Sequence, residues 1–104
     1  MKTYQINGAF TSPSVTTTVA ILTIPNGSNG LILCNPSTTH SLFVHFVPQG
    51  ATTPTTAEVL RGLRVYPGTQ LSIAVMNEPP YGCDVYLAME TGASATTINA
   101  YGLI

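Results

Sequence analysis

Apolar and polar residues alternate along several short segments of the chain. In segment 70–75, Leu71, Ile73 and Val75 are separated by polar or small residues, and segment 84–90 alternates in the same way. Successive side chains of a strand point to opposite faces of its sheet. This period of two therefore predicts strands with one face turned to a core.

Two further segments are apolar on both faces. Segment 30–35 is typical of a central strand that is covered on both sides. Segment 41–47 carries Leu42, Val44 and Phe46 on one face, and Phe43, His45 and Val47 on the other. We expect one face of this strand to bury something besides the ordinary core, such as a second subunit or the N-terminal arm.

Pro and Gly residues separate the apolar segments at intervals of about 8–12 residues, which is typical of a sandwich or barrel. No window of a dozen residues carries a helical stripe. The expected strands are 3–10, 17–24, 30–35, 41–47, one short strand within 59–66, then 70–76, 84–90 and 96–103. We therefore predict one all-β domain over 1–104, a single antiparallel, jelly-roll-like β-sandwich of about eight strands, with 1–12 as an N-terminal arm.

Charged residues make up only 7% of the chain, against about 25% in an ordinary soluble protein. The cations are Lys2, Arg61 and Arg64 and the net charge is −1, so we expect neither nucleic acid nor an anionic membrane as a partner. No apolar run is long enough to span a membrane, and the N-terminus does not resemble a signal peptide. We expect assembly in a cytoplasm, with much of the hydroxyl-rich surface covered in the working state. The alternative is a soluble β domain that carries Thr in place of Lys and Glu.

Candidate chemical groups are few. Glu78 and Asp84 flank one loop and would be the carboxylate pair of a small hydrolase, although two solvated charges explain them as well. His40 and His45 lack the spacing of metal ligands, and Cys34 and Cys83 form no CxxC pair, so we expect reduced thiols and no metal. No nucleophile or nucleotide motif occurs. We therefore predict no enzyme activity and no cofactor.

Aromatic residues are the remaining candidates for binding. Tyr66 and Tyr81 lie on expected turns, where they could contact a glycan. Tyrosines at strand ends are also common as core or interface anchors. Both interpretations stay open from the sequence.

The order of four segments resembles small β-sandwich proteins of tailed-bacteriophage particles. The segments are 31–37 (LILCNPS), 41–46 (SLFVHF), 65–73 (VYPGTQLSI) and 84–88 (DVYLA). In those proteins an apolar strand ending in N-x-S is followed by a short apolar strand, a turn with Pro-Gly and a strand beginning D/E-V-Y. The resemblance covers residues 17–103. Each motif is weak by itself, and it is their order along the chain that carries the resemblance.

The resemblance implies a structural virion protein, such as a capsid decoration or cement protein, a head fibre or a tail module. The partners it implies are the major capsid protein and further copies of this chain, with a trimer favoured. The expected interface residues are Tyr4, Ile6, Phe10, Phe43, His45, Val47, Tyr101, Leu103 and Ile104. The alternative is a carbohydrate- or receptor-binding module of a phage tail or fibre, which would use Tyr66 and Tyr81.

Overall fold

The computed structural model of the chain describes residues 13–22, 29–74 and 83–103. Its elements are β1 (Ser14–Val15), β2 (Ala20–Leu22), β3 (Gly30–Cys34), β4 (Leu42–Pro48), α1 (Thr56–Val59), β5 (Leu63–Val65), β6 (Gln70–Ala74), β7 (Cys83–Met89), β8 (Thr96–Thr97) and β9 (Asn99–Leu103). Within this described part, no helix is long and apolar enough to cross a membrane.

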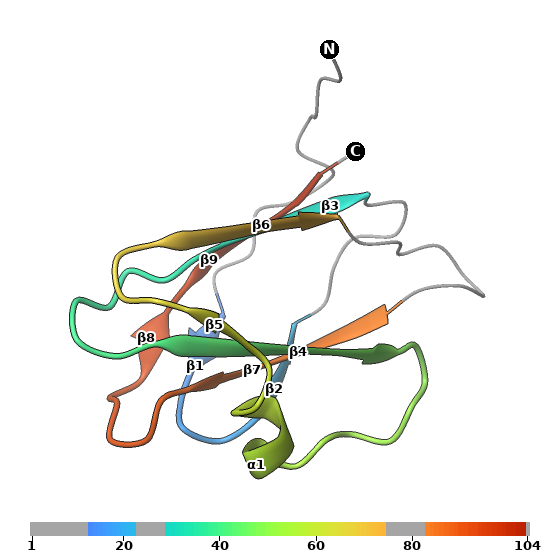
Figure 1. Cartoon of the computed structure of the whole chain (residues 1–104), viewed down its shortest axis with the longest axis horizontal. Helices are drawn as coiled ribbons and strands as arrows, with labels where there is room; N and C mark the ends of the chain where they lie inside the picture. Colours follow the sequence, from blue (N-terminus) through green and yellow to red (C-terminus); the bar gives the residue numbers. More distant parts are fainter. Residues whose placement is uncertain (1–12, 23–28, 75–82, 104) are drawn as a thin grey trace.

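The strands form two main sheets and one short pair. One sheet has the order β2-β7-β4-β5, the second has the order β6-β3-β9, and β1 pairs with β8. Every pairing is antiparallel. Figure 1 shows the layer of β6, β3 and β9 above the layer that holds β4 and β7.

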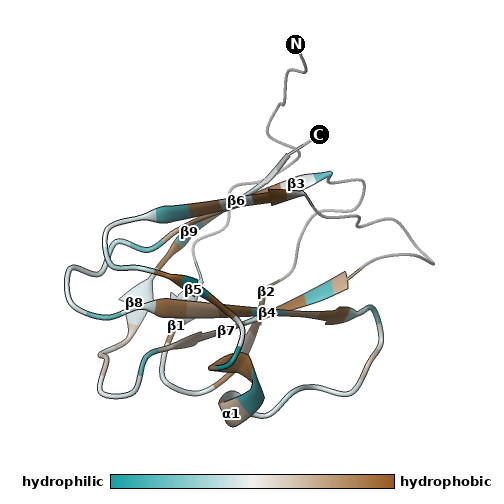
Figure 2. Ribbon diagram, viewed as in Figure 1, coloured by the Kyte–Doolittle hydropathy of each residue, from teal (hydrophilic) through white to brown (hydrophobic). Residues whose placement is uncertain are grey.

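A single apolar cluster fills the space between the two sheets. It draws buried side chains from both layers, including Leu31 and Leu33 of β3 together with Val44 of β4 and Leu87 of β7. The brown, hydrophobic stretches of β4 and β6 lie in these layers (Figure 2). The predicted all-β, antiparallel fold is therefore confirmed, while the jelly-roll-like sandwich stays a prediction.

A second, smaller apolar cluster lies on the other face of the four-stranded sheet. Tyr86 and Ala88 of β7 pack there with Val59 of α1, and Phe43 and Val47 of β4 join them half-buried. The helix α1 lies beneath this sheet in Figure 1. The apolar second face expected for segment 41–47 is therefore covered in part by the chain's own short helix.

Several local features differ from the sequence prediction. The helix α1 was not expected, because four residues are too few to show a helical period. The two-residue strand β1 was not expected either, and the expected strand 96–103 is divided at Ile98 into β8 and β9. Of the expected strand 17–24, residues 20–22 form β2, whereas residues 17–19 are not in a strand. The expected strand 3–10 and residues 23–24 and 75–76 lie outside the described residues.

The connection from α1 to β5 passes directly against β4. A Cβ atom built on Gly62 would overlap the carbonyl group of Val44, so only glycine fits this close approach of two backbone segments. The approach fixes the position of β5, the strand that carries Arg64, at the edge of the sheet.

Candidate binding surface

The side chains of Arg64 and Glu90 meet across β4. Arg64 lies opposite Phe43 in the register of β4 and β5. Its Nε donates to Ser41 Oγ at 2.8 Å and its Nη2 donates to Glu90 Oε2 at 3.1 Å. The backbone N–H of Ser41 donates to Glu90 Oε1 at 3.2 Å. These bonds hold the carboxylate of Glu90 in one orientation at the sheet surface.

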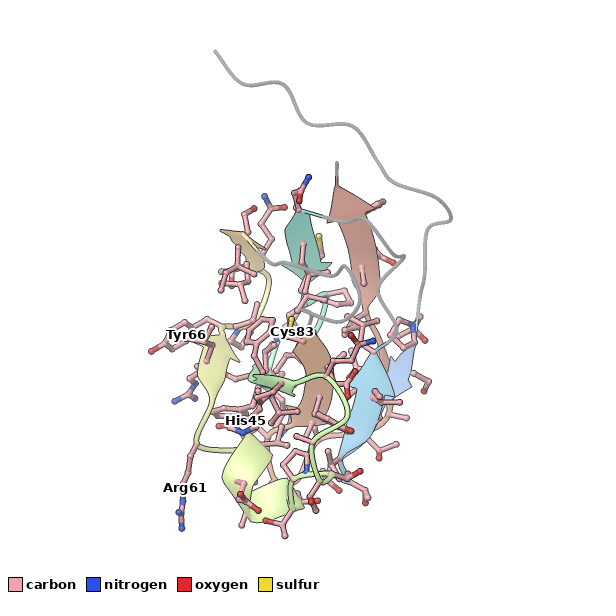
Figure 3. All side chains as sticks on the ribbon, turned by 90° about the vertical axis from the view of Figure 1, so that its right-hand side faces the viewer. His45, Arg61, Tyr66 and Cys83 are labelled. Atoms are coloured by element: carbon pink, nitrogen blue, oxygen red, sulfur yellow. The ribbon has the colours of Figure 1, made fainter. Side chains whose placement is uncertain are left out.

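Two aromatic rings flank the guanidinium group of Arg64. Its Cζ lies 4.9 Å from the ring centroid of Tyr66 and 5.6 Å from that of Phe43, both within cation–π range. The side chain of Tyr66 is 59% exposed and points away from the body of the molecule (Figure 3). These contacts add to the hydrogen bonds that hold Arg64 next to Glu90.

An open hollow of about 510 Å³ lies next to this ion pair. It is lined by Thr39, His40, Phe43, Leu60, Glu90 and Thr91. The hydroxyl of Thr39 lies 2.8 Å from His40 Nδ1, and this hydrogen bond orients the imidazole ring. The lining thus combines two apolar side chains with hydroxyl, imidazole and carboxylate groups.

The buried side chain of Asn35 holds the loop before β4 against the end of β5. Its Nδ2 donates to the carbonyl oxygens of His40 and Val65 at 3.0 Å each. Its Oδ1 accepts a hydrogen bond from the backbone N–H of Ser37 at 3.1 Å. Asn35 therefore fixes the loop that carries His40 relative to the end of β5, which leads to Tyr66.

A second hollow of about 440 Å³ lies at the start of β6, lined by Cys34, Asn35, Pro36, Gly68, Thr69 and Gln70. Cys34 Sγ donates a weak hydrogen bond to Gln70 Oε1 at 3.7 Å. Both cysteines are free, as expected from the sequence. Partial burial and the adjacent carboxylate of Asp84 raise the pKa of the Cys83 thiol above its usual value, which disfavours the reactive thiolate at neutral pH.

The predicted interface residues occupy different environments. Phe43, His45 and Val47 lie half-buried on β4, next to the cluster around α1, and Figure 3 shows His45 beside that helix. Tyr101 is half-buried on β9. Leu103 ends β9. Tyr4, Ile6, Phe10 and Ile104 lie outside the described residues. Whether all the predicted interface residues share one surface therefore stays a prediction.

The structure describes only some of the acidic, aromatic and histidine side chains that the sequence singles out. Asp84 accepts a hydrogen bond from the backbone N–H of Gly50 at 3.1 Å, whereas Glu78 and Tyr81 lie outside the described residues. His40 lines the hollow, while His45 lies on β4. In the described ranges no group of three or more His, Cys, Asp and Glu side chains could hold a metal ion.

The sequence alone does not reveal that Arg64, Ser41 and Glu90 form a cluster. The three residues come from separate segments, and their meeting depends on the register of three strands. An exposed Arg64 on an edge strand needs no partner, so its residue type alone gives no signal of the cluster. Comparisons with protein-family models, curated proteins and solved structures found no match.

Proposed function

We propose that this chain is a structural virion protein that binds the outside of a phage shell and stabilises it by bridging shell subunits. The proposal starts from the resemblance in strand order, and the two stacked sheets in Figure 1 are consistent with the sandwich form of those virion proteins. Its partners would be the major capsid protein and further copies of this chain, with a trimer favoured. The protein would act on the virion after assembly in the host cytoplasm, without catalysis and without a cofactor.

The observation that carries the proposal is the exposure of large apolar side chains on both edge strands of one sheet. Ile21 on β2 is 54% exposed and Leu63 on β5 is 45% exposed. These strands are the two ends of the order β2-β7-β4-β5. Edge strands are sites at which another chain can associate, and an apolar side chain exposed on each edge is consistent with a covered working state.

The scarcity of free charge also supports an assembled state. The charged side chains in the described part are Glu58, Arg61, Arg64, Asp84 and Glu90. Arg64 and Glu90 neutralise each other, and Glu58 is used to cap α1. A surface with so few unpaired charges has little electrostatic protection against association.

Stabilisation of the shell would follow from mass action. Each bound copy would bridge neighbouring shell subunits, so its binding free energy would be added to the assembled shell and not to free subunits. The proposed contacts are Ile21 and Leu63, together with the half-buried aromatic and apolar residues of β4 and the terminal residues expected from the sequence. The larger the apolar area buried at each site, the greater the stabilisation.

The first test is the number of copies in a particle. Particles that contain this chain are purified, and mass spectrometry quantifies the chain against the major shell protein. We expect a ratio of one to one or a simple fraction of it, because decoration follows the shell lattice. A count tens of times lower would place the chain in a tail or fibre, and absence from particles would refute the virion role.

A further inference from the structure

We propose that the hollow beside the Arg64–Glu90 ion pair binds an uncharged saccharide. The proposal is independent of the decoration role, because it rests only on the residues that line this hollow. The volume of about 510 Å³ lies within the range of small-molecule sites, which is about 300–1,000 Å³. Its lining residues all come from β4, the end of α1 and the loops at the adjacent ends of β4 and β7.

The charges at the hollow favour a neutral ligand. Glu90 is the carboxylate of the lining, and Arg64 neutralises it at 3.1 Å. Arg64 does not itself line the hollow, but its positive charge compensates the carboxylate of Glu90, so the hollow carries little net charge to attract an ion of either sign. A neutral ligand with many hydroxyl groups needs no such charge and can hydrogen-bond to the polar side chains of the lining.

The hollow offers hydrogen-bonding capacity that the protein itself leaves open. A carboxylate accepts about four hydrogen bonds, and the described contacts of Glu90 use one on each oxygen. His40 Nδ1 is occupied by Thr39, while within the described ranges no hydrogen bond reaches its Nε2. The hydroxyl group of Thr91 adds a donor and acceptor at the same rim.

The apolar part of the lining fits the carbon skeleton of a sugar. Phe43 and Leu60 line the hollow beside the polar groups. The ring of a saccharide presents C–H groups to one side and hydroxyl groups around its edge. Such a molecule can place its C–H groups on Phe43 and Leu60 and direct its hydroxyl groups to Glu90, Thr91 and His40. Arg64 acts here as a positioning residue, because it orients Glu90.

This site differs from the glycan contact expected from the sequence. Tyr66 does not line the hollow; it stacks on Arg64, which hydrogen-bonds to Glu90. The proposal therefore assigns recognition to Glu90 and the neighbouring loops, and predicts only a secondary effect for Tyr66. That difference makes the two assignments separable by mutation.

The test is titration of the isotope-labelled full chain with glucose, galactose, mannose and N-acetylglucosamine, followed by amide NMR shifts. We expect at least one sugar to shift the amides of Thr39, His40, Glu90 and Thr91 in a saturable manner. Glu90→Gln should weaken that binding at least about tenfold, because a bond to a charged acceptor is lost. Tyr66→Ala should weaken it much less, and the control Ser72→Ala, on the other sheet, should leave it unchanged.

Charged relatives of the same sugars complete the test. Glucuronate and glucosamine should bind more weakly than glucose. Tighter binding of either one would overturn the assignment of a neutral ligand. The absence of saturable shifts at the hollow with all sugars would overturn the site itself, as would loss of binding in Tyr66→Ala but not in Glu90→Gln. The dispersion of the amide spectrum of each variant verifies that it is folded.

Discussion

Asn35 is only 1% exposed, and its polar groups are all paired. Besides its side-chain bonds, its N–H donates to the carbonyl of Thr69 at 2.9 Å and its carbonyl accepts from Gly68 at 3.1 Å. A buried amide satisfied in this way fixes local geometry, because any displacement leaves polar groups without partners. At the scale of one residue, Asn35 therefore determines where the loop before β4 meets the end of β5.

The substitution Asn35→Asp tests this role. It replaces a donor by an acceptor next to the carbonyl oxygens of His40 and Val65, so we expect the free energy of unfolding to fall by about 3 kcal/mol at neutral pH. Part of the loss should be recovered at low pH, when the introduced carboxyl is protonated and can donate one hydrogen bond. Urea denaturation followed by circular dichroism measures both effects. Asn29→Asp, at an exposed position, is the matched control and should change stability little.

At the scale of elements, α1 depends on a capping box rather than on its length. Thr55 caps the helix, and its N–H and hydroxyl both donate to Glu58 Oε1 at 3.1 Å. The backbone hydrogen bond, and next the hydroxyl bond, lower the pKa of Glu58 below its usual value of 4.5. Because α1 covers Tyr86 and Ala88, its cap also contributes to the cover of the sheet.

This lowered pKa predicts a definite dependence of stability on pH. A carboxyl whose folded-state pKa is lowered stabilises the fold fully above its unfolded-state pKa, and the stabilisation is lost as pH falls through the folded-state value. Wild type should therefore exceed Glu58→Gln in free energy of unfolding at neutral pH, and the difference should vanish in acid. Denaturant unfolding across pH measures it. In a Thr55→Ala background the difference should be smaller, and a difference that grows towards low pH would contradict the capping role.

The strands and the helix differ in how well the sequence predicts them. β7 follows from alternation because Val85, Leu87 and Met89 all enter the core. The second face of β7 is harder to interpret from the sequence, since Tyr86 and Ala88 are buried by a helix of four residues together with half-buried side chains such as Phe43 and Val47 of β4. Such a short helix leaves no periodic signal, and its position depends on contacts with a strand far along the chain.

The candidate site was less accessible to sequence analysis than the fold. Tyr66 was identified because an aromatic residue on a turn is conspicuous by itself. Glu90 and Arg64 become a pair only once β5 and β7 lie on either side of β4. Strand order is a non-local property, and a single sequence contains no direct record of which strands are neighbours.

At the scale of the whole molecule, the distribution of charged and exposed apolar side chains determines which residues serve folding and which are available for assembly. The ion pair of Arg64 and Glu90 lies on the surface, with exposed fractions of 43% and 35%, and surface pairs of this kind contribute little to stability. Ile21 and Leu63 each leave about half of their surface exposed in the isolated fold, and that half adds nothing to its stability. Their free energy would be gained when a partner covers them, so mutations there should separate assembly from folding.

The substitutions Ile21→Glu and Leu63→Glu therefore provide the sharpest test of the proposed assembly surface. Each should leave the fold intact but weaken binding to undecorated shells at least about tenfold, since covering the exposed half of a large apolar side chain contributes about 1 kcal/mol and a Glu in its place would have to be desolvated at the contact. Co-sedimentation with shells measures the affinity. The control is Ser72→Glu, which adds the same charge at an exposed position of β6 in the other sheet. This variant should bind shells as tightly as wild type. If only Ser72→Glu weakens binding, the shell contacts the β6-β3-β9 sheet, and the exposed edges of the four-stranded sheet have another role.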